Sequence, residues 1–366
     1  MRVIVSGYYG SGNAGDEAML AGVIAGMREA AGEVDFVVIS RRPGLTARTH
    51  GVRSIGRTDV RSLRRELRAS SLLISGGGSL FQDVTSARSC LYYLWIVHQA
   101  LRAGVPVVAI GQGIGPLRRR WLRALVRRCL NRVQGIAVRD SGSARELQRL
   151  GVARAPVRVA ADLSLAMPPA DPQRVAEAWR DLGIGVPASV LAVAPRTWRV
   201  RGQADGSLPK LATAIRQAAA SLGQPWQVVC FPMQRPQDDA ACAALAAAVD
   251  GLVAGKELTP PMLAAMAGQT RAVVAMRLHA LIFAATGGAM PVAVSYDPKV
   301  QALMTDLGLP TVATTDRFDE ARLAAAIVEA WNADDAARAK LRRVMEERRD
   351  AVREVFRWAA ETARRS

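Results

Sequence analysis

Short apolar runs alternate along the chain with longer stretches of helical periodicity. In the first half these runs are nearly continuous, which is typical of parallel strands covered by helices on both faces. The predicted strands there are residues 2–8, 34–40, 72–75, 106–111 and 135–139, and the predicted helices are residues 15–31, 88–104, 121–132 and 141–150. The alternation of strand and helix predicts an α/β fold with a doubly wound parallel sheet.

The same alternation starts again after a proline-rich segment at residues 167–172. Predicted strands follow at residues 190–194, 227–231, 271–276, 291–295 and 311–313, and predicted helices at residues 208–222, 238–250, 300–307 and 320–331, with one more helix that begins near His279. Residues 334–366 carry apolar side chains at helical spacing, which predicts one long amphipathic helix. We therefore expect domains over residues 1–168 and 169–333, and a final helix over residues 334–366 that packs back across them.

Glycine-rich motifs come at the ends of three predicted strands of the first domain. They are residues 7–17 (GYYGSGNAGDE), 75–83 (SGGGSLFQD) and 111–116 (GQGIGP). Glycine lets the backbone approach a ligand closely, and the carboxyl ends of parallel strands share one edge of the sheet. The first motif lacks the Gly-Lys-Ser/Thr of a Walker loop and the later acidic residue of a dinucleotide site. The alternative is a structural turn in which Asp16 and Glu17 complement the helix dipole.

Basic residues follow the predicted strands of the second domain. Arg196 follows the first strand, Arg277 and His279 follow residues 271–276, and Lys299 follows residues 291–295. Neighbouring strand ends would gather these side chains into a cationic floor that suits a small anion with carboxylate or phosphate groups. The alternatives are a core histidine and a surface lysine. Two further histidines have no expected role in the site: His50, which we place in a polar loop, and His98, on a helix.

The formal net charge is +17, and its distribution is uneven. Residues 1–168 carry +14 and the remainder carries +3. Such a field favours an anionic partner, which can be a phosphorylated substrate, an anionic membrane surface or nucleic acid. Nucleic acid ranks last, because the chain has neither a basic stripe interleaved with aromatic residues nor a nucleic-acid-binding motif.

Cysteine and histidine usage argues against a metal site. Cys90, Cys129, Cys230 and Cys242 lack metal-like spacing, and the chain has only three histidines. We expect buried thiols and no metal. No apolar run is long enough to span a bilayer, and the N-terminus lacks the apolar core of a signal peptide, so we expect a cytoplasmic protein.

Taken together in their order, the motifs resemble those of the polysaccharide pyruvyl transferases. The resemblance rests on residues 7–17, 76–83 and 111–116, on Met276-Arg277-Leu278-His279 and on Tyr296-Asp297-Pro298-Lys299. It extends over most of the chain and is strongest to the bacterial cell-wall branch of the family.

The resemblance implies two Rossmann-like doubly wound domains in a GT-B-like arrangement with a cleft between them. It also implies phosphoenolpyruvate as donor substrate, with no metal and no cofactor. The acceptor would be an N-acetylmannosamine of a lipid-linked wall-polymer precursor, and the product a 4,6-pyruvate ketal through which surface-layer proteins bind the wall. The charge of the first domain then suits peripheral contact with the anionic inner membrane face, and no nucleic acid is involved.

On this hypothesis the second domain binds the donor through Arg196, Arg277, Leu278, His279 and Lys299. The first domain binds the acceptor through Tyr8, Gly10, Asn13, Asp16, Gly77, Gly78, Asp83, Gln112 and Arg139. His279 is the expected general acid, because imidazole transfers protons near neutral pH. Arg277 and Arg196 stabilise the carboxylate and the departing phosphate, and Lys299 supports the phosphate as a point charge. Asp16 is the expected base, with Asp83 as the second choice.

Two other classes of protein remain open. A GT-B glycosyltransferase that uses a nucleotide sugar has the same architecture and would bind a nucleoside diphosphate in the second domain. A non-catalytic sugar- or polymer-binding protein would tolerate the loss of Arg277 and His279 without chemical consequence.

Overall fold

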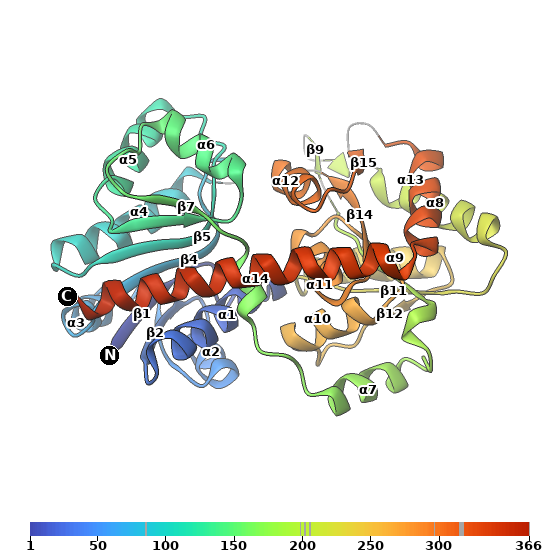
Figure 1. Cartoon of the computed structure of the whole chain (residues 1–366), viewed down its shortest axis with the longest axis horizontal. Coiled ribbons are helices and arrows are strands. Elements are labelled where there is room, and N and C mark those ends of the chain that lie inside the picture. The colour runs from blue at the N-terminus through green and yellow to red at the C-terminus, as the bar shows by residue number, and fades with distance from the viewer. Residues whose placement is uncertain are drawn as a thin grey trace. The chain divides into compact units, whose positions relative to one another are not determined.

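The chain folds into two compact units, each built on a parallel sheet (Figure 1). Unit 1 comprises Met1–Pro168 and Glu347–Ser366, and unit 2 comprises Pro169–Glu346. The computed structural model describes residues 1–84, 86–197, 199–200, 203–204, 206–295, 297–314 and 318–365, with the backbone alone at residues 199–200 and 203–204. Tyr296 of the predicted donor motif lies outside the described residues.

Unit 1 has a seven-stranded parallel sheet in the order β3-β2-β1-β4-β5-β6-β7. Its strands are β1 (Arg2–Ser6), β2 (Asp35–Ser40), β3 (Arg53–Gly56), β4 (Leu72–Phe81), β5 (Val107–Ile114), β6 (Gly135–Val138) and β7 (Val157–Val159). Its helices are α1 (Ala14–Ala31), α2 (Pro43–His50), α3 (Val60–Arg68), α4 (Ala87–Arg102), α5 (Arg120–Leu130), α6 (Ser141–Leu150) and the short 3₁₀ helix η1 (Leu163–Ala166). The central strands are buried along their length, which explains their continuous apolar sequence.

Helices cover both faces of this sheet. The side chains of α3, α4, α5 and α6 form one apolar core with the central strands. On the other face α1 packs against η1 and against the last helix, α14 (Asp335–Arg364). A Cβ atom at Gly26 of α1 would lie 2.1 Å from the Phe356 ring, so glycine is what allows α14 to pack this closely.

Unit 2 has a six-stranded parallel sheet in the order β12-β11-β8-β13-β14-β15, and a separate antiparallel pair formed by β9 and β10. The strands are β8 (Val190–Ala194), β9 (Arg199–Val200), β10 (Gln203–Ala204), β11 (Gln227–Cys230), β12 (Leu252–Val253), β13 (Ala272–Ala275), β14 (Met290–Ser295) and β15 (Thr311–Thr314). The helices are α7 (Pro172–Asp181), η2 (Pro187–Ser189), α8 (Ser207–Leu222), α9 (Asp239–Ala248), α10 (Pro260–Gln269), α11 (Leu278–Gly287), α12 (Pro298–Asp306) and α13 (Glu320–Asn332).

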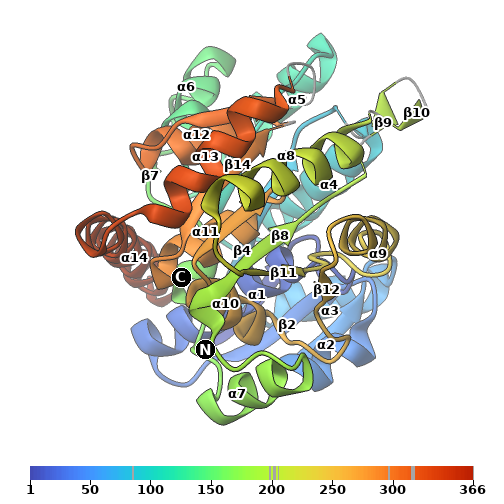
Figure 2. The same ribbon diagram turned by 90° about the vertical axis from the view of Figure 1, so that its right-hand side faces the viewer.

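The helices of unit 2 also form two layers. The side chains of α8, α9 and α13 share one apolar core with the strands. On the opposite face α10 and α11 lie side by side (Figure 2). Their backbones meet at Gly268 and Gly287, where an added Cβ atom would lie within 2.8 Å of the other glycine's Cα atom.

The last helix, α14, contributes to the packing of both units. In its first part the buried guanidinium group of Arg338 donates hydrogen bonds to the carbonyl groups of Arg271, Gly288 and Ala330, which lie in unit 2. In its second part Arg349 donates to the carbonyl oxygen of Leu165 in unit 1 (3.0 Å). Among the described helices, none combines the length and the apolar character that a transmembrane span requires.

Two sequence-based expectations are wrong. The second and third glycine motifs do not follow their strands, because β4 and β5 continue through them to Phe81 and Ile114 with irregular register. His50 does not lie in a loop, because residues 43–50 form α2. The region of α2, β3 and α3 was missed because α2 is short and polar, α3 is rich in arginine and β3 is at most partly buried. None of the three shows a clear apolar pattern.

Candidate active site

The topology defines one edge of each sheet where a ligand is expected to bind. The strand order reverses between β1 and β4 in unit 1, and between β8 and β13 in unit 2. At such a switch point the connecting segments leave the sheet in opposite directions, and a crevice opens beyond the carboxyl ends of the strands. Residues that follow these four strands are therefore the first candidates for ligand contacts.

In unit 1 part of the glycine pattern is explained by the burial of Tyr9. The Tyr9 hydroxyl group donates a hydrogen bond to the carbonyl oxygen of Gly76 (2.8 Å). A Cβ atom at Gly7 would lie 2.4 Å from the Tyr9 ring, and one at Gly76 would lie 2.9 Å from its hydroxyl oxygen. Burial first, and then the nearby Asp16 and Glu17 carboxylates, raise the pKa of Tyr9 well above its usual value. Tyr9 is therefore a neutral packing residue that ties the loop after β1 to β4.

Asp16 lies at the switch point of unit 1. Asn13 caps α1 by accepting a hydrogen bond from the backbone N–H of Gly15 (3.0 Å), which places Asp16 in the first helical turn. The Asp16 side chain is largely buried, and its Oδ1 atom would lie 3.4 Å from a Cβ atom at Gly78. The structure therefore brings together Asn13, Asp16 and Gly78, three of the residues that the sequence assigns to the acceptor.

A chain of contacts supports the loop that precedes α1. The Gly10 N–H group donates to Oε1 of Glu17 (2.8 Å), and Oε2 of Glu17 lies 3.0 Å from Nε2 of His50. Arg42 donates from Nε to the Gly10 carbonyl oxygen (2.8 Å). Gly10 has φ +73°, and a Cβ atom there would lie 2.2 Å from Oγ of Ser40. His50, which sequence reasoning left out, therefore helps to hold this loop.

Asp83, the second choice for the base, has another role in the structure. Its carboxylate accepts hydrogen bonds from the backbone N–H groups of Arg118 (2.8 Å) and Arg119 (2.9 Å), and it pairs with the Arg119 guanidinium group. Burial raises the pKa of Asp83, but these backbone and guanidinium donors outweigh it and hold the pKa below its usual value. Asp83 anchors the segment that leads into α5.

Two further predicted acceptor residues, Gln112 and Arg139, lie near the carboxyl ends of β5 and β6. Gln112 is fully buried and donates from Nε2 to the carbonyl oxygen of Ser75 (2.9 Å). Arg139 donates from Nη2 to Oγ of Ser79 (3.1 Å), and its Nε lies 3.4 Å from the Asp140 carboxylate. Gly113 makes room for this guanidinium group, because a Cβ atom there would lie 2.4 Å from Nη2 of Arg139.

The last two predicted acceptor residues, Tyr8 and Gly77, both contribute to packing in unit 1. Tyr8 is partly buried and packs against the main core of unit 1. Gly77 has φ +62°, and a Cβ atom there would clash with the Met19 side chain at 2.6 Å from Sδ. The glycine at position 77 is thus required by the packing of α1 on β4.

In unit 2 the predicted donor residues follow three adjacent strands. Arg196 follows β8, Arg277 and His279 follow β13, and Lys299 lies in the first turn of α12 after β14. Leu278 is buried as the first residue of α11, with Arg277 and His279 on either side of it in sequence. The His279 ring lies 6.2 Å from that of Phe283, one helical turn further on.

Arg277 is fixed by residues that sequence reasoning did not select. Its guanidinium group binds the Asp238 carboxylate side-on, through Nε (3.0 Å) and Nη2, and donates from Nη1 to Oε1 of Gln234 (3.3 Å). Asp238 also accepts a hydrogen bond from the Gln234 N–H group (2.8 Å). Both partners follow β11, beside β8 in the sheet. The signal for this pair in the sequence is the presence of the polar residues Gln234 and Asp238 after β11.

The floor of unit 2 is therefore less positive than the sequence predicted. Asp238 neutralises Arg277, and Nζ of Lys299 lies 3.1 Å from the Asp297 carboxylate. A guanidinium group has five N–H donors. Within the described part of the chain three of those on Arg277 are taken, which leaves one on Nη1 and one on Nη2. Such a fork matches a carboxylate or a phosphate.

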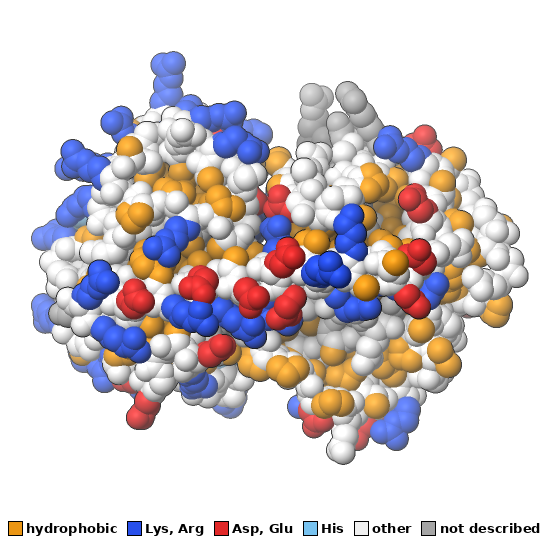
Figure 3. All heavy atoms as spheres, in the orientation of Figure 1, with side chains coloured by type: hydrophobic (Ala, Val, Ile, Leu, Met, Phe, Trp, Pro, Cys, Tyr) orange, Lys and Arg blue, Asp and Glu red, His pale blue; other side chains and the backbone are white. Residues whose placement is uncertain are grey.

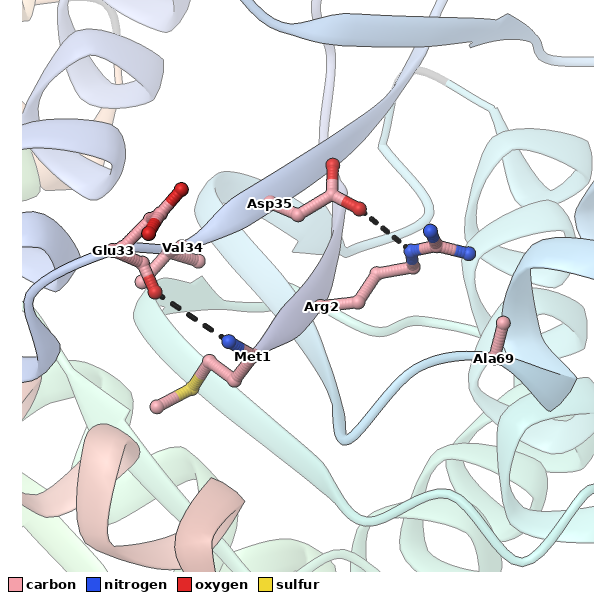
Figure 4. A pocket seen from close by; sticks show the side chains of 6 residues that line it. All are labelled: Met1, Arg2, Glu33, Val34, Asp35 and Ala69. Carbon is pink, nitrogen blue, oxygen red and sulfur yellow. Dashed lines mark hydrogen bonds and ion pairs between the residues drawn. The ribbon is translucent and has the colours of Figure 1, made fainter.

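Two observations bear on other kinds of site. Within the described ranges, no group of three or more His, Cys, Asp and Glu side chains could hold a metal ion. An open hollow lies at the amino ends of β1 and β2, lined by Met1, Arg2, Glu33, Val34, Asp35 and Ala69 (Figure 4). It is partly closed by the ion pair of Arg2 and Asp35 (2.8 Å). This hollow is at the edge of the sheet opposite to the switch point.

The class of protein follows from comparison with known families. The family model described as polysaccharide pyruvyl transferase matches residues 13–298. This match covers most of the chain, and the chain belongs to the polysaccharide pyruvyl transferase family. It is accordingly a transferase of polysaccharide biosynthesis. No curated protein matches the chain in sequence.

Solved structures with the same fold are distant in sequence. The UDP-GlcNAc 2-epimerase from Neisseria meningitidis, bound to UDP-GlcNAc, has a TM-score of 0.64 at 10% identity, with 100% of both chains covered. Anabaena HepE, in complex with UDP-glucose, has a TM-score of 0.64 at 14% identity, again with 100% of both chains covered. A glycosyltransferase from Rickettsia africae has a TM-score of 0.60 at 9% identity, with 100% of this chain and 96% of that chain covered. These likenesses confirm the two-domain GT-B-like fold that the family resemblance implied.

Proposed function

We propose that this protein transfers pyruvate from phosphoenolpyruvate to a sugar of a lipid-linked cell-wall polysaccharide precursor, as a 4,6-ketal, with release of phosphate. The proposed acceptor sugar is N-acetylmannosamine. The observation that carries the donor assignment is the Arg277 fork at the switch point of unit 2, which Asp238 and Gln234 hold in one orientation. No cofactor or metal takes part in the proposed reaction.

Phosphoenolpyruvate carries a carboxylate and a phosphate on a three-carbon frame, so its site needs donors for both. The two remaining N–H groups of Arg277 bind one of these anions. Arg196, on the other side of the same switch point, and Lys299, on the next strand, supply positive charge for the other. The carboxylate partners of Arg277 and Lys299 keep the site from being a general anion trap, because they reduce its net charge.

The proposed chemistry has two steps. His279 donates a proton to the methylene carbon of phosphoenolpyruvate while one sugar hydroxyl group adds to the central carbon and loses its proton to Asp16. The second hydroxyl group then attacks the same carbon, and the bond between this carbon and the phosphate oxygen breaks. The proton of the second hydroxyl group leaves with the phosphate. Arg277 stabilises the negative charge that develops on the departing phosphate.

The experiment that tests this proposal measures phosphate release from phosphoenolpyruvate, with and without an aryl-linked or lipid-linked N-acetylmannosaminyl acceptor. We expect release that depends on the acceptor, together with the gain of one pyruvyl group on the sugar by mass spectrometry. If phosphoenolpyruvate raises the melting temperature but no acceptor gives release, the proposed acceptor is wrong. If it neither reacts nor stabilises the protein, the proposed donor is wrong.

A His279→Ala variant tests the assignment of the acid. We expect kcat to fall by about 10²- to 10⁴-fold, the usual contribution of a general acid, with a much smaller change in donor affinity. The matched control is His98→Ala on α4, an exposed histidine that lies outside the site. A His279→Ala enzyme with the turnover of the control would show that another group supplies the proton.

Transfer from a nucleotide sugar is the second candidate function. It is favoured by the fold likeness to proteins solved with UDP-GlcNAc and with UDP-glucose. It predicts that UDP raises the melting temperature of the protein and that phosphoenolpyruvate does not displace it. The first proposal predicts that phosphoenolpyruvate raises the melting temperature more than UDP does.

A further inference from the structure

The outer face of α5 combines positive charge with exposed apolar side chains. Trp121 is 49% exposed and Leu125 is 42% exposed, one helical turn apart. The opposite stripe of the helix, with Leu122 and Val126, is fully buried in the core of unit 1. We call the exposed face the α5 surface. It comprises Arg118, Arg120, Trp121, Arg123, Leu125 and Arg128.

No acidic residue offsets this charge nearby in the sequence. Residues 84–139 contain ten arginines and neither aspartate nor glutamate. The acidic residues that flank this segment are both buried: Asp83 binds backbone N–H groups, and Asp140 caps α6. Within the part of the chain that the structure describes, no ion pair joins Arg120, Arg123 or Arg128 to a carboxylate. Figure 3 shows basic side chains gathered over the region of α5 and α6.

We propose that the α5 surface binds the surface of an anionic lipid bilayer. Arginine forks match lipid phosphate groups, and each basic residue near such a surface adds to the attraction. Trp121 is suited to the boundary between headgroups and acyl chains, because its ring is apolar and its N–H group is polar. Leu125, on the same stripe, adds apolar area that a purely electrostatic partner such as nucleic acid would leave unused.

The α5 surface is joined to the predicted acceptor residues of unit 1. The chain passes from the third glycine motif, at the end of β5, directly into Arg118 and α5. Asp83, at the end of β4, fixes this connection by accepting the N–H groups of Arg118 and Arg119. A bilayer bound at α5 therefore lies next to the edge where an acceptor sugar on a lipid carrier would enter. This purpose rests on the proposed function, whereas lipid binding itself does not.

The test is flotation of the purified full-length protein with two kinds of vesicle. One kind is phosphatidylcholine alone, and the other contains about 30% phosphatidylglycerol, at about 0.15 M salt. We expect binding to the anionic vesicles only. The triple variant Arg120→Gln/Arg123→Gln/Arg128→Gln should bind them about 100-fold more weakly. The matched control, Arg174→Gln/Arg322→Gln/Arg343→Gln, removes the same charge from exposed positions on α7, α13 and α14 and should bind as wild type does.

A second variant, Trp121→Ala/Leu125→Ala, keeps all charges and should also lose binding, by about tenfold or more. The proposal is wrong if wild type does not float with anionic vesicles, or if the triple variant and its control bind equally. It is also wrong if single-stranded DNA displaces the vesicles and binds the Trp121→Ala/Leu125→Ala variant as tightly as wild type, because the surface is then a polyanion site. Phosphate release with a soluble aryl-linked acceptor should be normal in all these variants, so failure of the proposed function is seen separately.

Discussion

The Asp238 carboxylate determines which N–H groups of Arg277 remain for a ligand. An arginine at a switch point looks like a free cation in the sequence, but here its side-on edge is already occupied by a carboxylate that is almost fully buried. The ion pair reduces the positive charge at Arg277. It also fixes the orientation of the side chain, because a bidentate contact holds the plane of the guanidinium group. If Arg277 binds the donor as proposed, its two remaining N–H groups meet a planar anion from a fixed orientation, and less entropy is lost on binding.

Replacing Asp238 with asparagine should separate orientation from charge. We expect Asp238→Asn to raise the KM for phosphoenolpyruvate by about tenfold or more, since one acceptor oxygen is lost and the plane of Arg277 is no longer fixed. The matched control is Asp239→Asn, whose partner is the more exposed Arg235. Steady-state kinetics and thermal melting distinguish the two variants. An unchanged KM in Asp238→Asn would mean that Arg277 does not contact the donor.

The residues that sequence reasoning missed have a common cause. Asp238 and Arg277 lie 39 positions apart, and His50 and Glu17 lie 33 apart. Spacing along the chain does not indicate such pairs until the strand order is known. Asp238 and Arg277, for example, are close because β11 and β13 lie on either side of β8. The strand-end motifs around Asp16 and Arg277 could be found because each is continuous in sequence. Their roles in binding and catalysis stay predictions.

At the scale of elements, the second and third glycine motifs lie inside strands. β4 and β5 run through them, and several of the glycines are there to admit a neighbouring side chain: Gly76 admits Tyr9, Gly77 admits Met19 and Gly113 admits Arg139. Gly113 differs from Gly77 in that its φ is not positive, so alanine is compatible with its backbone. An alanine at position 113 therefore tests the steric effect of an added methyl group on Arg139 without straining the backbone.

A Gly113→Ala variant should move Arg139 away from Ser79 without unfolding the sheet. The new methyl group would meet the far end of a flexible side chain, so we expect the free energy of unfolding to fall by about 1–3 kcal/mol at most. The KM for the sugar acceptor should rise, and the KM for phosphoenolpyruvate should not. Gly44→Ala is the control, since its nearest neighbour is 3.8 Å away. Equal rises in both KM values would show that the damage is general rather than confined to the acceptor side.

At the scale of the whole molecule, unit 1 is assembled from two distant parts of the chain. Its sheet comes from residues before Pro168, and one of its covering helices comes from residues after Glu347. The N-terminus and the C-terminus both lie in this unit (Figure 1). The contact of Phe356 with α1 at Gly26, and that of Arg349 with Leu165, join the two parts.

Removing the Phe356 ring should therefore weaken unit 1. We expect Phe356→Ala to lower the free energy of unfolding by about 3–5 kcal/mol, as for other large buried aromatic residues, and to speed hydrogen exchange in α1. The control is Arg357→Ala, an exposed neighbour paired with Glu354, for which we expect a change of about 0.5 kcal/mol or less. Urea denaturation and hydrogen exchange measure the two effects. Unchanged exchange in α1 would mean that its helix does not depend on α14.

Most of this architecture is visible in the sequence, because parallel strands buried on both faces leave long apolar runs. The alternation of these runs with helices predicts both sheets. It does not predict α2, α3 or β3, whose sequences are polar or rich in arginine, and it also misses the short strands β7 and β12 and the helices α7 and α10. Nor does it show that the two-stranded pair β9 and β10 stands apart from the main sheet of unit 2.

The discontinuity of unit 1 has a consequence for the order of events on the ribosome. The first part of unit 1 emerges early, but the apolar face of α1 that contacts α14, around Gly26, stays uncovered until residues 347–366 have been made. At typical rates of translation the whole of unit 2 is synthesised in the interval, which takes roughly 10 to 35 seconds. The unit that begins first is thus the one completed last, and a nascent chain stalled within unit 2 would present that apolar face to chaperones.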